Sequence, residues 1–304
     1  MLTARRGVTL IELVVSMLIG GMVLGLVASV SVRQQRIYSD IADGEALSGQ
    51  LRDAAAVLPI DLRGASPGGG DIRSGEARDT SIELRATIST AVVCDTTTSA
   101  LVLSPTMADS VGASFGSTLS AIQAGDTAWV FSASDSSADW VPHAITAVST
   151  VPGAACAALG PRLSGSALFA ARAALVLDGI PILSSAIGQP IRVTRPLRYS
   201  LYKSSDGAWY LGERDWNPST KKFNTIQPVS GPYLSPASRG VSFSYLDSVG
   251  AVLPTPVSDT RGIALVRVAL RGVTRAPVRA LGSAASIGGR VDSVVVSVLL
   301  RNRR

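Results

Sequence analysis

The N-terminal part of the chain contains a long and almost unbroken run of apolar residues. Residues 7–32 read GVTLIELVVSMLIGGMVLGLVASVSV, and Glu12 is the only charged residue among them. At a rise of about 1.5 Å per residue, a helix over residues 8–32 can cross a hydrocarbon core of roughly 30 Å. Arg5 and Arg6 come directly before the run, which favours a cytoplasmic N-terminus. The pattern predicts one membrane-spanning helix, with the rest of the chain beyond the membrane.

After the membrane segment, apolar residues recur every three or four positions, as they do on an amphipathic helix. Pro59 is expected to end or bend this helix, because proline lacks a backbone N–H group. We therefore predict one helix over residues 8–58, whose second half packs against the domain that follows. The apolar positions on its predicted packing stripe are Ile37, Ile41, Leu47, Leu51, Ala55 and Leu58.

Residues 59–304 have the pattern of a β-rich domain. Apolar and polar residues alternate from Ile82 to Ile88, which predicts a half-buried strand running towards Cys94. Asp206-Gly207 between two aromatic-bearing runs predicts a hairpin. Further strands are predicted at residues 128–131, 143–148, 173–177, 191–195, 199–203, 208–212, 241–246, 262–270 and 291–300. Glycine-rich residues 63–79 are predicted to be an exposed connection, and residues 104–125 and 230–239 are predicted to be loops.

Glu12 needs a physical explanation. An ionised carboxylate costs on the order of 2.5–3.5 kcal/mol at the centre of a membrane helix, and somewhat less near an end. One interpretation is an interfacial acid at the helix N-terminus, where the macrodipole favours negative charge. The other is an ion pair, because pairing lowers the cost of two charges in apolar surroundings.

The residues around Glu12 read Arg5-Arg6-Gly7-Val8-Thr9-Leu10-Ile11-Glu12-Leu13 and closely resemble the prepilin signal of type IV pilins and type II secretion pseudopilins. The resemblance implies that prepilin peptidase cuts between Gly7 and Val8, so that residues 1–7 are a leader peptide. It also implies that the new amine of Val8 is methylated. This amine can pair with Glu12 within one helix or between staggered subunits, and the resemblance favours the pair between subunits.

The second half of the chain is similar to the larger minor subunits of this superfamily, the PilW-like minor pilins and the J-type minor pseudopilins. The similarity rests on the order of Tyr199-Ser-Leu-Tyr, Trp209-Tyr-Leu, Val241-Ser-Phe-Ser-Tyr-Leu-Asp, a strand around Arg267, and Val296-Ser-Val-Leu-Leu-Arg-Asn. It implies an α+β fold, with a long N-terminal helix packed on a mainly antiparallel sheet.

The same resemblance implies a structural subunit of a type IV pilus or type II secretion pseudopilus. Its expected place is the bacterial inner membrane, crossed once, with the globular domain in the periplasm or cell exterior. The implied partners are prepilin peptidase, other pilin or pseudopilin subunits and the inner-membrane assembly platform.

Composition and cysteine content refine this picture. The formal net charge is +6, and the basic clusters lack interleaved aromatic residues, so we expect no direct binding of nucleic acid. Cys94 and Cys156 are the only cysteines. In an oxidising compartment they are expected to form one disulfide, which would stabilise the fold by roughly 4 kcal/mol in the chain-entropy model. Two unlinked buried cysteines are the alternative.

Groups that could carry catalysis are scarce. His143 is the only histidine, and it lies in a predicted strand. Acids at Asp135 and Asp139 suggest a calcium loop, but the glycine and the bidentate glutamate of a recognised loop are absent. Trp209, Tyr210 and Trp216 are expected to pack in the hairpin and core rather than to form a sugar-binding platform. We expect no cofactor, no metal and no enzymatic activity.

Two other classes of protein stay open. The first is a secreted, adhesin-like or carbohydrate-binding protein whose residues 1–28 are a removable export signal. Against it, the apolar run exceeds the usual 7–15 residues of such a signal and contains Glu12. The second is a membrane-anchored enzyme, which the scarcity of catalytic groups disfavours.

Overall fold

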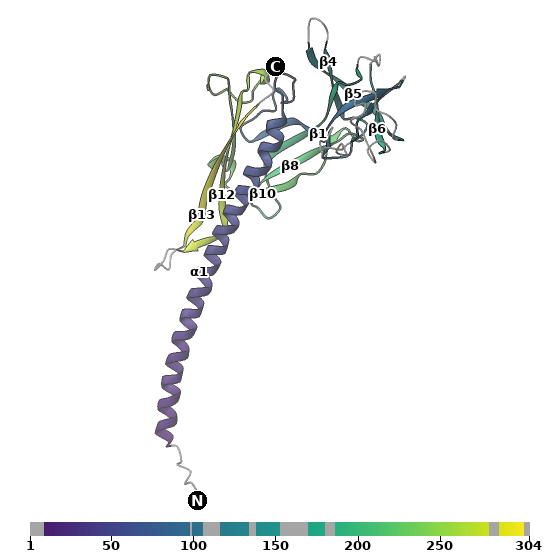
Figure 1. Cartoon of the computed structure of the whole chain (residues 1–304). Coiled ribbons are helices and arrows are strands. Elements are labelled where there is room, and N and C mark those ends of the chain that lie inside the picture. The colour runs from purple at the N-terminus through teal and green to yellow at the C-terminus, as the bar shows by residue number, and fades with distance from the viewer. Residues whose placement is uncertain are drawn as a thin grey trace, which may run out of the picture. The chain divides into compact units, whose positions relative to one another are not determined.

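The computed structural model describes residues 9–97, 99–105, 116–133, 138–152, 170–179, 186–279 and 286–300. It contains one long helix and a large antiparallel β structure, which confirms the predicted α+β class (Figure 1). The chain divides into two compact units. Met1–Gly49 and Val273–Asp292 form the helix–hairpin unit, while Gln50–Gly272 and Ser293–Arg304 form the sheet unit.

Helix α1 spans Leu10–Gly64, so the prediction that it ends at Leu58 is wrong. It continues through Pro59, although a proline inside a helix costs about 3 kcal/mol. Leu58 and Leu62 lie on either side of the proline, and both are completely buried. Burying such side chains stabilises by about 1.5–3 kcal/mol each, which offsets the cost of the proline.

The predicted packing stripe on α1 is only partly correct. Its buried positions Leu47, Leu51 and Leu58 are confirmed. Ala54 is buried in place of the predicted Ala55, and Ile37 and Ile41 are 44% and 51% exposed. Periodicity identifies a helix face, but it does not tell at which turn that face becomes covered.

The strands, in chain order, are β1 Ser81–Thr96, β2 Ala100–Leu103, β3 Ser117–Thr118, β4 Thr127–Ala133, β5 Ala138–Val151, β6 Arg172–Leu177, β7 Pro190–Lys203, β8 Trp209–Asn217, β9 Lys222–Phe223, β10 Gln227–Tyr233, β11 Val241–Leu246, β12 Leu265–Arg279 and β13 Ser286–Leu299. Each predicted strand has a counterpart among them. The predicted pair 191–195 and 199–203 is one continuous strand, β7. Strand β3 lies inside the predicted loop 104–125, and the last four residues of β10 lie inside the predicted loop 230–239. These two loop predictions are therefore partly wrong.

The part of the sheet that carries the helix has the strand order β11-β12-β10-β8-β7, and β1 pairs with the other edge of β7. Tyr199 on β7 stands between two neighbours, with Ile82 of β1 on one side and Glu213 of β8 on the other. The last part of α1 lies across this sheet (Figure 1). Tyr199 is therefore placed beneath the helix.

Beyond this sheet, strand pairing closes into a ring. β1 pairs with β7, β7 with β4, β4 with β5, β5 with β6, β6 with β2, and β2 returns to the end of β1. A closed ring of antiparallel strands is a barrel, whose interior is filled by alternate side chains. These six strands supply one continuous core, made of Ile88, Ala91, Val93, Leu101, Leu103, Ala128, Val130, Ile145, Leu175, Leu177, Ile191 and Val193. The long strands β1 and β7 thus belong to both the sheet and the barrel.

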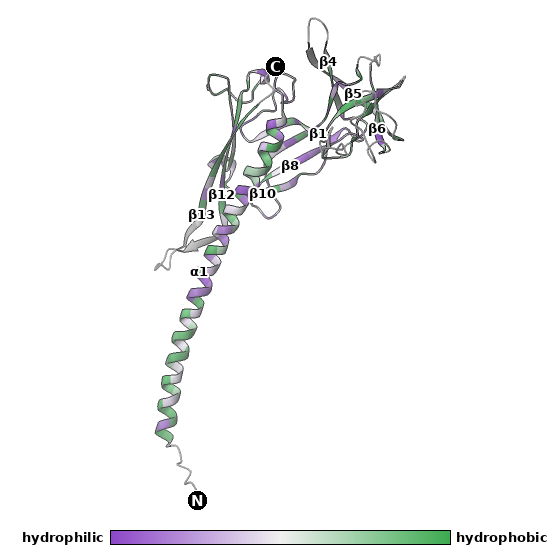
Figure 2. Ribbon diagram, viewed as in Figure 1, coloured by the Kyte–Doolittle hydropathy of each residue, from purple (hydrophilic) through white to green (hydrophobic). Residues whose placement is uncertain are grey.

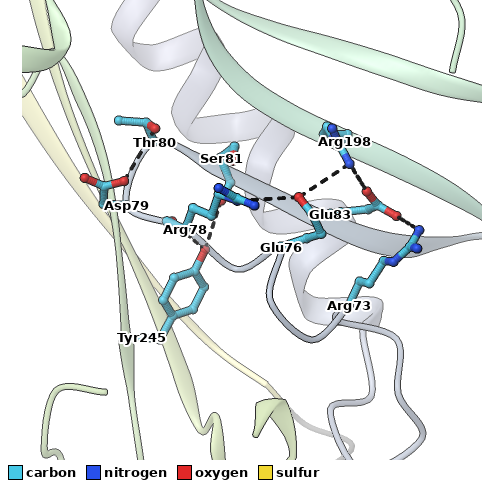
Figure 3. A network of polar contacts seen from close by, with 9 residues as sticks. All are labelled: Arg73, Glu76, Arg78, Asp79, Thr80, Ser81, Glu83, Arg198 and Tyr245. Atoms are coloured by element: carbon cyan, nitrogen blue, oxygen red, sulfur yellow. Dashed lines mark hydrogen bonds and ion pairs between the residues drawn. The ribbon is translucent and has the colours of Figure 1, made fainter. Parts of the chain in front are cut away.

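The connection from α1 to β1 is not the exposed loop predicted from its glycines. Ile72 and Ala77 are buried, and each forms a β-bridge, with Leu84 and Val257 respectively. A polar network holds the same stretch (Figure 3). Buried Glu83 accepts hydrogen bonds from Arg73 Nη1 at 2.8 Å and from Arg198 Nε at 3.0 Å. Because two guanidinium groups flank it, the buried carboxylate is charge-paired.

A second ion pair closes the end of the helix. Arg192 on β7 donates two hydrogen bonds to the buried carboxylate of Asp71, at 2.8 and 3.1 Å. Its Nη1 also donates to the carbonyl oxygen of Gly64, the last residue of α1, at 3.1 Å. A cation at a helix C-terminus satisfies a free carbonyl and complements the macrodipole. This contact ties the helix end to the strand that the sheet and the barrel share.

Carboxyl groups surround the hydroxyl of Tyr199. The hydroxyl donates to Asp61 Oδ2 of α1 at 2.6 Å, and Glu213 lies on the neighbouring strand. Burial raises the pKa of Asp61 above its ordinary value of 3.8, and nearby Asp215 raises it further. Burial and Asp215 likewise raise the pKa of Glu213. The folded state therefore binds protons here more tightly than the unfolded chain does.

Replacing Leu62 by alanine tests the packing of α1 on the sheet. We expect Leu62→Ala to lower the free energy of unfolding by about 2–5 kcal/mol, because it opens a cavity in a fully buried site. Ile60, on the same turn, is 67% exposed, and Ile60→Ala should change it by less than about 0.5 kcal/mol. Denaturant unfolding of the detergent-solubilised chain measures both, and equal effects would contradict the packing described.

Asp61→Asn tests the acid cluster. Folding raises the pKa of Asp61 above its ordinary value of 3.8. The protonated Asp61 therefore stabilises the folded state fully below pH 3.8, and this stabilisation is lost as the pH rises through the pKa of the folded state. We expect Asp61→Asn to weaken the decline in unfolding free energy as the pH rises above 3.8, since an amide keeps the acceptor for Tyr199 without a charge. Glu213→Gln should act in the same direction. Unchanged pH profiles in both variants would refute this assignment.

Candidate functional site: the N-terminal half of the helix

The start of α1 is closed by a reciprocal pair of hydrogen bonds. Thr9 immediately precedes the helix, and its backbone N–H donates to Glu12 Oε2 at 3.0 Å. In return, the backbone N–H of Glu12 donates to the hydroxyl oxygen of Thr9 at 3.3 Å. The Thr9 hydroxyl also donates to Glu12 Oε2 at 3.1 Å. This arrangement is a capping box, which satisfies backbone donors that a helix start otherwise leaves free.

The capping box could have been read from the sequence. Thr-x-x-Glu before an apolar run is its recognised pattern, and Thr9 and Glu12 have this spacing. The helix macrodipole and an ion pair were the two reasons expected for Glu12, and neither includes these local hydrogen bonds.

The apolar surface that follows is left uncovered by the chain itself (Figure 2). Large apolar side chains of this segment expose between 45% (Val32) and 84% (Leu10) of their surface. By length and composition this helix can cross a membrane. Exposing this much apolar surface to water is unfavourable. The segment therefore requires a bilayer or other apolar helices around it.

Three glycines lie within this exposed segment. At Gly20, Gly21 and Gly25 an added Cβ would meet no atom within 4 Å, other than the helix's own neighbouring backbone. Their small surfaces are therefore not used for packing inside this chain. Small residues let helix backbones approach closely in apolar surroundings, so these positions suit contact with a second helix.

The predicted processing residues, Gly7 and Val8, lie outside the described residues. The predicted ion pair of Glu12 with the amine of Val8 stays a prediction, because that amine exists only after cleavage. In the described part of the chain, the ion pairs found do not involve Glu12. Its capping role shows what the carboxylate does while the leader is attached.

Cys94 is buried and disulfide-bonded. Cys156, the other cysteine of the chain, lies outside the described residues, so its pairing with Cys94 stays a prediction. Cys94 lies near the end of β1, beside the point where the barrel closes. A covalent link at this point would hold the barrel rather than the helix.

The residues considered for catalysis do not assemble into a site. His143 lies on β5, where its Nδ1 is 3.2 Å from the carbonyl oxygen of Asp178. The side chains of Asp135 and Asp139 lie outside the described residues. Trp216 packs edge-to-face on Phe223, with ring centroids 5.2 Å apart. Among the described residues, no cluster of three or more His, Cys, Asp or Glu side chains could hold a metal.

Comparison with known proteins identifies the N-terminal segment. Residues 2–28 match the family model of the prokaryotic N-terminal methylation motif, a prepilin signal of the type IV pilin kind. No curated protein and no solved structure matches the chain. The match supports a relationship to the type IV pilin-like superfamily, whose motif family is structural rather than catalytic. With the apolar helix, it indicates a protein anchored in the membrane by a single pass.

Proposed function

We propose that this protein is a minor subunit of a type IV pilus or a type II secretion pseudopilus. Prepilin peptidase removes residues 1–7 and methylates Val8, and the mature subunit waits in the inner membrane with its β domain outside. It then joins a filament by packing residues 8–32 against the helices of other subunits, with the assembly platform as its membrane partner. The prepilin motif over residues 2–28 carries this proposal.

The uncovered surface of α1 supports the assembly step. In the bilayer, lipid covers the apolar side chains of residues 10–32 and the capping box satisfies the helix start. When the subunit leaves the membrane, only other helices can replace the lipid. The carboxylate of Glu12 then becomes a partner for the cationic amine of a neighbouring Val8, because both charges are costly in an apolar bundle unless they are paired.

The similarity of the second half to PilW-like and J-type subunits favours a minor subunit over the main one. The size of the β domain agrees with this, since the six-stranded barrel adds a second β core beside the sheet that carries the helix. A position near the filament tip leaves most room for such a domain.

Replacing Gly7 by a bulky residue tests the processing step. We expect Gly7→Leu to leave an unprocessed precursor in the native host, because the peptidase must bind the chain at this residue to cut after it. Intact-mass spectrometry of the membrane fraction reads the result. A normal mature mass in Gly7→Leu would refute cleavage at this site.

Two substitutions of Glu12 separate its charge from its role in the capping box. Glutamine at this position keeps an acceptor for the N–H of Thr9, whereas alanine removes it. We expect both Glu12→Gln and Glu12→Ala to be processed normally and both to assemble poorly, because neither can pair with an amine. Counts of filaments, or of cross-links between subunits, measure assembly. Full assembly of Glu12→Gln would show that hydrogen bonding suffices and that the ion pair is wrong.

The alternative function is a secreted or membrane-anchored, adhesin-like binding protein with an ordinary export signal. The first residue of the mature protein separates the two functions. The pilin-like function requires Val8, while the export-signal alternative requires Ser29, after Leu26-Val27-Ala28. N-terminal sequencing of protein isolated from its native membrane decides between them.

A further inference from the structure

Strand β13 leaves one edge of the sheet open. It pairs with β12 (Figure 1), and among the described residues no other strand or β-bridge lies along its second side. We call this side, over residues 293–299, the open edge. The outer side of β11, at another edge, is covered by connecting chain, because the N–H of Phe243 donates to the carbonyl oxygen of Asp79 at 2.7 Å. The N–H of Leu253 also donates to the carbonyl oxygen of Tyr245 there, at 2.8 Å.

The backbone of β13 presents hydrogen-bonding groups along the open edge. On the other side of the strand, the N–H of Leu300 donates to the carbonyl oxygen of Ala264, just before β12, at 3.0 Å. In an antiparallel pair, alternate residues turn their N–H and C=O groups towards the partner strand, and the residues between them turn these groups away. Val295, Ser297 and Leu299 therefore direct theirs towards the open edge. Such a row of groups is a template for another strand.

The sequence of β13 does not protect this edge. Natural edge strands are commonly protected by charged residues, proline or a bulge. Residues 293–300 contain no charged residue and no proline. Val295 and Leu299, whose side chains lie on the outer face, are 58% and 59% exposed, while Val298 on the opposite face is buried. The open edge is thus unpaired and apolar on its outer face.

Two hydrogen bonds fix the register between β13 and β12. The first is the bond from Leu300 to Ala264. The second runs from the N–H of Arg290 to the hydroxyl of Thr274 at 2.9 Å, and it lies ten residues away on each strand. Because the register is the same at both bonds, residues can be matched across the pair by counting from either one.

Two arginines lie beside the open edge, on the outer face of β12. In this register Arg267 is opposite Ser297, and Arg271 is opposite Ser293. Both arginines are exposed, and the ion pairs of the described part of the chain do not include them. Each arginine therefore borders a small side chain, over which it can reach towards the open edge.

These features specify the partner that fits. The outward N–H and C=O groups can be matched by an extended polypeptide strand, lying about 5 Å from β13 and about 10 Å from β12. An apolar side chain opposite Val295 would extend the apolar surface. Acidic side chains two residues to either side would lie opposite Ser293 and Ser297, at the spacing of the two arginines. Arginine and glutamate, reaching over a serine, can meet across this distance.

We propose that the open edge of β13 binds an extended acidic segment of a partner polypeptide, which adds to the sheet as an antiparallel strand. The segment carries an apolar residue with an acid two positions before it and another two positions after it. Backbone hydrogen bonds supply affinity, and the side chains of Val295, Arg267 and Arg271 select the sequence. The site belongs to the sheet unit alone, and it depends neither on leader cleavage nor on filament assembly.

Binding of synthetic peptides to the full-length chain in phosphatidylcholine nanodiscs tests the proposal. The probe is the fluorescent peptide TETVTET, and EETTTTV, of the same composition, is its control. We expect saturable binding of TETVTET, about tenfold tighter than that of the control, because only TETVTET places both acids and the valine opposite their partners. Equal binding of the two peptides, or no binding of TETVTET up to about 1 mM, would overturn the proposal.

Variants of the chain test where the peptide binds. We expect Val295→Glu to weaken binding of TETVTET by more than about tenfold, because it replaces an apolar contact by a charge of the peptide's own sign. Arg267→Gln and Arg271→Gln should each weaken it by about two- to fivefold. Val249, on the turn after β11, is 86% exposed, and Val249→Glu is the matched control that should bind normally. Equal effects of the two glutamate variants would overturn the proposal.

N-methylated peptides distinguish strand addition from simple attraction of charge. In the antiparallel pair, the glutamates and the valine of TETVTET turn their N–H groups towards β13, and the threonines turn theirs away. We expect N-methylation of the glutamates and the valine to abolish binding, and N-methylation of the two inner threonines to preserve it. Any other pattern would overturn the proposal.

Discussion

The rest of the structure depends on the apolar surface of α1 that the chain does not cover. Up to Val32 the helix is apolar on all sides and exposed, whereas further along it is buried on a single stripe that includes Leu51 and Leu62. One helix therefore serves two environments in succession. The first half requires lipid or other helices, and the second half is fixed to its own sheet by side chains that are fully removed from water.

The sheet holds the helix at its end as well as along its face. Arg192 donates hydrogen bonds to both Asp71 and the last carbonyl of α1, and Asp61 accepts a hydrogen bond from the hydroxyl of Tyr199. Both anchoring residues, Arg192 and Tyr199, belong to β7, which pairs with three other strands. A pull on the helix would therefore be distributed over β7 and the strands paired with it rather than borne by one loop.

The sequence predicted the features that depend on local pattern. The apolar run, the prepilin motif and most strands were all predicted from periodicity and short motifs. Features that depend on distant partners were missed. The end of the helix at Gly64 depends on Arg192, the buried connection depends on contacts with Val257 and β1, and the closure of the barrel depends on β2, a strand of only Ala100–Leu103. The sequence near each of these features does not indicate which distant residue it contacts.

The barrel strands other than β1 and β7 form one continuous insertion in the chain. β1 and β7 pair at Val92 and Pro190, and the strands that complete the barrel, β2, β4, β5 and β6, all come from the chain between these two residues. A short turn could join the two strands there without disturbing the part that carries the helix. The barrel is thus an insertion between β1 and β7, and evolution can enlarge, trim or exchange it while the half of the molecule that carries the helix stays as it is.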